Sequence, residues 1–217
     1  ISETLVNTGT TTLTATYVFT LTANGCSNTQ NVTVTIYPTA TLTSTLTPSA
    51  ICSGTTFSYT PTSATSGVTF SWSRATVAGI SNTAGSGTGN PNETLTNTTD
   101  NPVNVTYVYT LSVGGCTNPS SYNVVVTVNP RPALSSTLTP SAICNNTTFS
   151  YTPTSNTLNA NPSTFTWTRA AIATINSNVG GSGTGSISET LVNSSTAPVV
   201  VTYVYTVAAN GCSRTQN

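Results

Sequence analysis

The feature that most constrains the fold of this chain is an internal repeat with a period of about 93 residues. The string TLTPSAIC occurs at 45–52 and again at 137–144. The string VTYVYT occurs at 105–110 and again at 201–206. Recurrence at a fixed period is typical of arrays in which one structural unit is repeated along the chain.

The repeat divides the chain into three units. The string ISETLVN stands at the start of the chain and returns two periods later, at 187–193. We therefore expect 1–38 to be the C-terminal part of a first β-sandwich repeat, 39–130 to be a complete repeat, and 131–217 to be a third repeat without its last strand. On this division the chain is predicted to be a piece of a longer array.

Apolar and polar residues alternate within the complete unit. The alternation is clear in the segments 57–61, 68–72, 103–109 and 122–128. A period of two is that of a strand with one apolar and one polar face. The last two segments are predicted to form a long hairpin. About seven short strands per unit predict an all-β fold class of tandem immunoglobulin-like, antiparallel β-sandwich domains.

The junctions between units are short and contain proline. Pro38 ends the first unit, Pro130 ends the second, and Pro132 lies at the start of the third. Proline restricts φ and removes a backbone donor, so a proline-containing junction is semi-rigid. We therefore expect the units to form an extended rod.

The composition excludes several classes of function. Among 217 residues there are four cationic side chains, four acids and no His. Four cations cannot neutralise a phosphate backbone, so nucleic acid is not an expected partner. General acid–base catalysis has almost no side chains to use, so we expect no enzyme activity and no cofactor. No apolar run is long enough for a membrane span, so direct membrane insertion is not expected.

The five cysteines occur at repeating positions. Each of the two later units has an early cysteine, Cys52 or Cys144, and a late one, Cys116 or Cys212. Two cysteines per unit at the same phase predict one disulfide per unit, Cys52–Cys116 and Cys144–Cys212, and hence an oxidising compartment. Cys26 is the late cysteine of the first unit and is expected to be unpaired in this chain. Free buried thiols are the alternative, and the absence of His and of close cysteine pairs argues against a metal site.

Two tryptophans also recur, Trp72 and Trp167. They lie in phase with a preceding phenylalanine in each unit and are predicted to be structural core residues rather than sugar-stacking platforms.

Charged residues recur beside them. Arg74 and Arg169 share one phase, and Glu3, Glu93 and Glu189 share another. A residue that returns in every unit is better explained by the fold than by a single active site. The sequence leaves four interpretations open: a Glu–Arg pair within each unit, an arginine that caps its strand, an arginine stacked on an aromatic ring, and a ligand site.

The strings AICSGTTFSYTPTS, FSWSR and NVTYVYTLSVGGCTNPSSYNVVVTVNP together resemble the PKD-like repeats of Bacteroidota cell-surface proteins, most of all those of giant SprB-type gliding-motility adhesins. The resemblance covers the whole chain and implies an immunoglobulin-like fold and export by the type IX system. The acidic WDFGDG stretch of ordinary PKD domains is here Trp72-Ser73-Arg74, so a calcium site is not implied.

The resemblance implies a structural stalk segment of a very large, secreted, filamentous adhesin that serves surface attachment or gliding motility. The expected location is extracellular, on the bacterial cell surface and associated with the outer membrane. Its partners would be neighbouring repeats of the same chain, surface polysaccharide, and the export or motility machinery. Two alternatives stay open: repeats that themselves bind glycan or protein ligands, and a self-associating surface sheath.

Overall fold

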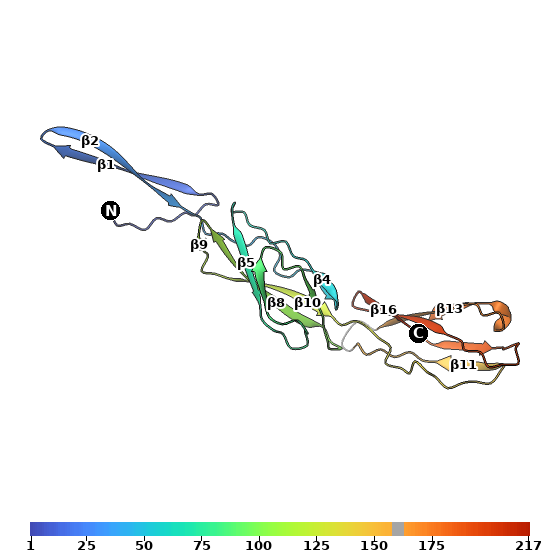
Figure 1. Ribbon diagram of the computed structural model, residues 1–217. Helices are drawn as coiled ribbons and strands as arrows, with labels where there is room; N and C mark the ends of the chain where they lie inside the picture. Colours follow the sequence, from blue (N-terminus) through green and yellow to red (C-terminus); the bar gives the residue numbers. More distant parts are fainter. Residues whose placement is uncertain (158–162) are drawn as a thin grey trace.

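The computed structural model describes residues 1–157 and 163–217 and shows an almost entirely β protein drawn out into a row (Figure 1). A two-stranded hairpin lies at one end, a sandwich follows it, and a second, more open sandwich lies at the other end. We call these unit 1 (1–38), unit 2 (39–130) and unit 3 (131–217). The all-β, immunoglobulin-like fold class is thus confirmed.

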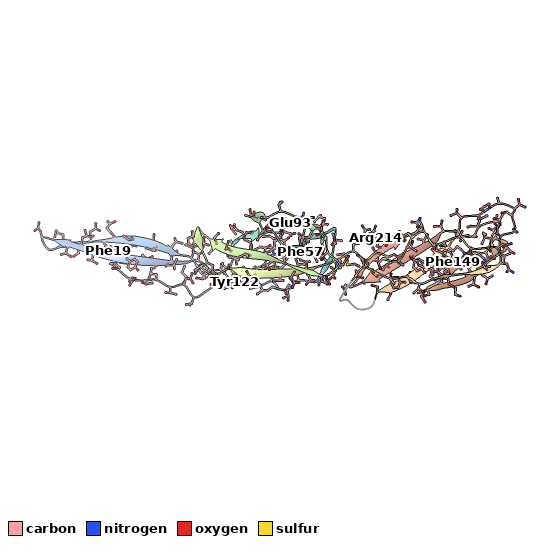
Figure 2. All side chains as sticks on the ribbon, turned by 90° about the horizontal axis from the view of Figure 1, so that it is seen from below. Phe19, Phe57, Glu93, Tyr122, Phe149 and Arg214 are labelled. Atoms are coloured by element: carbon pink, nitrogen blue, oxygen red, sulfur yellow. A yellow bond between two sulfur atoms is a disulfide. The ribbon has the colours of Figure 1, made fainter. Side chains whose placement is uncertain are left out.

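Unit 1 contains a single long hairpin. Strands β1 (Leu13–Ala23) and β2 (Cys26–Ile36) pair antiparallel over their full length. Asn24 and Gly25 both have positive φ, as the two central residues of a type I′ hairpin turn require. Among the described residues no second sheet covers the apolar side chains of the hairpin, and Phe19 is 43% exposed (Figure 2).

Unit 2 is a sandwich of two sheets. The larger sheet has the order β3-β10-β8-β5-β6, with β9 also on β8, and the smaller one pairs β4 with β7. All neighbours are antiparallel except β3 and β10, which run parallel. The strands are β3 (Ile51–Cys52), β4 (Thr55–Phe57), β5 (Thr69–Arg74), β6 (Gly85–Thr88), β7 (Glu93–Leu95), β8 (Val103–Val113), β9 (Cys116–Thr117) and β10 (Tyr122–Asn129).

The core of unit 2 lies between the two sheets. The hairpin predicted from the alternating pattern is confirmed, since β8 and β10 pair from Tyr109↔Tyr122 to Val103↔Val128. Alternate residues of both strands point inward, and Tyr107, Tyr109 and Leu111 are fully buried. Phe57 covers them from the smaller sheet with its ring 5.1 Å from that of Tyr107 (Figure 2).

Unit 3 repeats this plan, but its described residues contain no counterparts of β3 and β10. Its sheets have the orders β13-β12-β15-β16 and β11-β14. An apolar groove lined by Leu138, Phe149, Tyr151 and Tyr203 lies where Val124, Val126 and Val128 fill unit 2. The elements are β11 (Thr147–Tyr151), β12 (Thr164–Arg169), the 3-10 turn η1 (Asn176–Asn178), β13 (Gly181–Thr184), β14 (Ile187–Leu191), β15 (Tyr203–Ala209) and β16 (Cys212–Gln216).

Candidate functional site

The recurring Glu and Arg residues form an ion pair inside unit 2. Arg74, at the end of β5, donates from Nε and Nη2 to the two carboxylate oxygens of Glu93 on β7, both at 2.9 Å. Nη2 also donates to the Thr83 carbonyl at 2.6 Å, and the Tyr107 hydroxyl donates to Glu93 Oε2 at 2.7 Å. Arg74 is only 2% exposed, so this pair joins the two sheets from within.

The same pair occurs in unit 3. Arg169 Nη2 donates to Glu189 Oε1 at 2.6 Å, and the Tyr203 hydroxyl donates to Glu189 Oε2 at 2.6 Å. In unit 1 the Tyr17 hydroxyl donates to Glu3, the third copy of the acid. A Glu–Arg pair within the unit, one of the interpretations open at the level of sequence, is therefore present in both sandwiches.

The electrostatics of these acids fit a structural role. The hydrogen bonds from Arg74 hold the pKa of the Glu93 carboxyl below its usual value, and those from Arg169 do the same for Glu189. Burial raises the pKa of the Tyr107 hydroxyl that completes the cluster. Because both acids stay ionised and both arginines are committed to them, neither group is suited to proton transfer near neutral pH.

The two tryptophans pack on glycines of the neighbouring strand. Trp72 is 8% exposed, and a Cβ at Gly87 would stand 2.9 Å from its ring. Its ring meets that of Tyr107 edge-on, with the centroids 5.5 Å apart. Trp167 is half-buried and packs in the same way on Gly183. These contacts cover one face of each ring; Trp72 belongs to the hydrophobic core of unit 2, whereas Trp167 is only partly buried.

Over 1–157 and 163–217 no three His, Cys, Asp or Glu side chains cluster as metal ligands would. In the same ranges no helix has the length and apolarity needed to cross a bilayer.

The contact between units 2 and 3, which we call joint 2, is covalent. A disulfide links Cys52 to Cys212, with the two Cα atoms 5.6 Å apart. Beside it, Asn129 Nδ2 donates to the carbonyl of Asn210 at 3.0 Å, and the Asn129 side chain is almost fully buried. Joint 2 thus holds the β15–β16 turn of unit 3 against the end of β10 in unit 2.

This bond shows that the predicted pairing Cys52–Cys116 and Cys144–Cys212 is wrong. The two cysteines of one unit lie at opposite ends of it: Cys52 is level with Asn129, at the end of β10, whereas Cys116 is opposite Val113, at the far end of β8. Strand β8 alone spans about 33 Å at roughly 3.3 Å per residue, far beyond the Cα separation of about 7 Å that a disulfide tolerates. The thiols of Cys26, Cys116 and Cys144 are free and exposed.

The contact between units 1 and 2, joint 1, has the same layout with different side chains. Tyr37, the counterpart of Asn129, lies against Gly114, the counterpart of Asn210, so closely that a Cβ at Gly114 would stand 2.1 Å from the Tyr37 ring. Asn118 Nδ2 donates to the carbonyl of Ala40 at 2.7 Å. The turn after β8 therefore contacts the end of β2 as the turn after β15 contacts the end of β10.

Burial along the two linkers is also the same. Pro38 and Pro130 are buried, the next residue is exposed in both, and the one after that, Ala40 or Pro132, is buried again. Both linkers are therefore partly buried, and Ala40 belongs to the hydrophobic core of unit 2.

Comparison with known protein families gives two matches, both to the PKD-like domain, at residues 49–132 and 141–216. The chain belongs to the PKD-like domain family. Comparison with curated proteins gives no match. The PKD-like part of the resemblance is thereby confirmed, and the two matched segments meet across joint 2.

One set of recurring residues was not singled out from the sequence. Asn97 is buried and donates from Nδ2 to the carbonyls of Asn101 and Val128, which ties its loop to β10. Asn7 makes the equivalent bond to the Ile36 carbonyl in unit 1. Asn193 occupies the same phase in unit 3 and donates to Ala197. Recurrence at one phase was the signal that could have found them.

Proposed function

We propose that this chain is a segment of the structural stalk of a very large, secreted, filamentous cell-surface adhesin that serves attachment or gliding motility. The observation that carries the proposal is the joint: units lie end to end and are held there by a disulfide and by buried polar contacts. A row of domains with fixed joints gives reach and stiffness, and each unit contacts only its neighbours.

The inward and outward residues support a spacer over a binding module. The repeated aromatic and charged residues, such as Trp72, Arg74 and Tyr107, are engaged within their own unit. The large aromatic side chains that are exposed in the described residues, Phe19 and Tyr37, both belong to unit 1. A ligand-binding repeat would present the same exposed aromatic patch in unit after unit.

The chemistry of the joint supports the proposed location. A structural disulfide forms and persists in an oxidising compartment, which supports a place outside the cytoplasm. The resemblance to Bacteroidota surface proteins adds export by the type IX system and attachment to the outer surface. The partners proposed are neighbouring repeats of the same chain and, at the ends of the filament, surface polysaccharide or the motility machinery. No enzymatic activity and no nucleic-acid partner are proposed.

Small-angle X-ray scattering of the full chain at several concentrations tests the rod. Three units of about 35 Å each give a radius of gyration of about 32 Å, whereas a compact chain of this length would give about 17 Å. A value near 17 Å would overturn the stalk. A scattering mass that rises steadily with concentration would instead favour the self-associating sheath.

A further inference from the structure

We propose that the cysteines form a ladder along the array, in which the early cysteine of each unit bonds to the late cysteine of the next. The bond between Cys52 and Cys212 is one rung of this ladder. On this proposal Cys144 bonds to the late cysteine of a following unit, and Cys116 and Cys26 bond to the early cysteines of preceding units. The ladder rests on the joints alone and does not require that the array be a stalk.

The first support is that the same hydrogen bonds follow Cys52 and Cys144, although Cys52 lies on β3 and Cys144 lies outside the strands. Thr55 Oγ1 donates to the Cys52 carbonyl at 2.6 Å, and Thr147 Oγ1 donates to the Cys144 carbonyl at the same distance. Two residues after each cysteine, a backbone N–H donates to a carbonyl at the end of a strand: Gly54 to Leu95 of β7, and Asn146 to Leu191 of β14. Cys144 is therefore placed at the far end of unit 3 and is exposed there.

The second support is that the three late cysteines occupy one position in three equivalent hairpins. Cys212 pairs with Ala209, Cys116 with Val113, and Cys26 with Ala23, each directly after the turn. At joint 1 the turn that precedes Cys116 is already seated against unit 1, through Tyr37. Cys116 thus occupies, relative to unit 1, the place that Cys212 occupies relative to unit 2.

The chemistry of each rung is ordinary thiol oxidation. Two thiols lose two protons, their sulfurs join, and two electrons pass to a disulfide-exchange oxidant, which is reduced to a dithiol. An early cysteine cannot reach the late cysteine of its own unit, because the two lie at opposite ends of the long β8–β10 hairpin.

A ladder of this kind limits how far the array can be stretched. The shortest covalent path through two units would run along the chain only from Cys116 to Cys144, about 28 residues, before the next bond. That path extends to roughly 100 Å, against roughly 650 Å for two unfolded units without bonds, at about 3.5 Å per residue. Two folded units span about 70 Å, so the array would lengthen by less than half even if force unfolded its domains.

Peptide mapping under non-reducing conditions tests the ladder on the chain and on an extended form. In the chain itself, oxidised and alkylated before digestion, we expect Cys52 bonded to Cys212 and alkylated Cys26, Cys116 and Cys144. The extended form carries a copy of residues 124–217 after Asn217, which supplies the missing strand of unit 3 and a further unit. There we expect one new bond, between Cys144 and the copy of Cys212.

Two outcomes would overturn the ladder: Cys144 still alkylated in the folded extended chain, or a bond between the two cysteines of the added unit. A matched variant, Cys144→Ser, should free the copy of Cys212 and leave Cys52–Cys212 intact. If that extension does not fold, a copy of residues 131–186 placed before Ile1 completes unit 1 instead. It should convert Cys116 from a thiol into a partner of the copied Cys144, and a Cys116 that stays alkylated there counts against the proposal.

Discussion

Loss of the bond between Cys52 and Cys212 should uncouple units 2 and 3. The bond closes a loop with a sequence separation of 160 residues. In the chain-entropy treatment of cross-links, a loop of that length removes about 5 kcal/mol of conformational freedom from the unfolded chain. We expect Cys212→Ser to lower the combined free energy of unfolding of the two units by up to that amount and to separate their transitions.

The sharper assay is single-molecule pulling on the two termini of the full chain. With the bond intact, force passes directly from Cys52 to Cys212, and the residues between them carry no load. Without the bond, those residues unfold and lengthen the chain by about 550 Å, at roughly 3.5 Å per residue. The Cα atoms start only 5.6 Å apart, so almost the whole contour length is released.

The matched control is Cys116→Ser, which removes an exposed thiol of the same type that has no bond in this chain. Its pulling trace should equal that of the oxidised parent, whereas the reduced parent should behave like Cys212→Ser. Release of the full 550 Å from the oxidised parent would refute the reasoning, since it would mean that units 2 and 3 are not bridged.

Three further outcomes follow. Glu93→Ala should destabilise unit 2 by about 3 kcal/mol in urea titrations, because it leaves buried Arg74 unpaired, whereas Glu3→Ala on the open hairpin should change little. Gly114→Asn should keep the turn, since asparagine tolerates positive φ, but it should displace the Tyr37 ring and so speed amide hydrogen exchange at joint 1. The double variant Gly114→Asn with Tyr37→Asn has the side chains of joint 2 and should restore slow exchange there. Fast exchange in the double variant would argue against equivalent joints. The melting temperature should change by less than about 10 °C between pH 5 and 8, and it should decrease once the pH is lowered below about 4. A carboxyl with a lowered pKa, such as that of Glu93, stabilises the fold above its unfolded pKa and loses that contribution as the pH falls through its folded pKa. A steep change of the melting temperature near neutral pH would contradict this.

Much of the fold was predictable from the sequence. The alternation around Tyr107 and Tyr109 predicts the long hairpin, because a period of two leaves one face of the strand to be buried. Recurrence of Glu93 at one phase pointed to the fold rather than to a catalytic site. Both inferences use a local alternation or a repeated residue, and either can be recognised from the sequence without knowing which segments are neighbours in the fold.

The remaining features of the fold depend on how the strands are arranged in three dimensions. The parallel pairing of β3 with β10 joins segments from opposite ends of unit 2 and has no local signal. The carboxylate of Glu93 could be assigned to Arg74 only as one of several interpretations, because the approach of β7 to β5 across the sandwich is a tertiary event. The close packing of Tyr37 on Gly114 also joins two units and leaves no periodic trace.

The cysteines show most clearly what the sequence determines and what the tertiary structure determines. The sequence by itself determined that each later unit has an early and a late cysteine, that these recur at one phase, and that the chain has no His or Lys and only four acidic side chains. It could not determine which cysteines meet, because phase defines equivalent positions and not neighbours. The tertiary structure decided that, since β8 and β10 carry the two cysteines of a unit to opposite ends. Proximity across the joint, and not membership of the same repeat, brings Cys52 to Cys212.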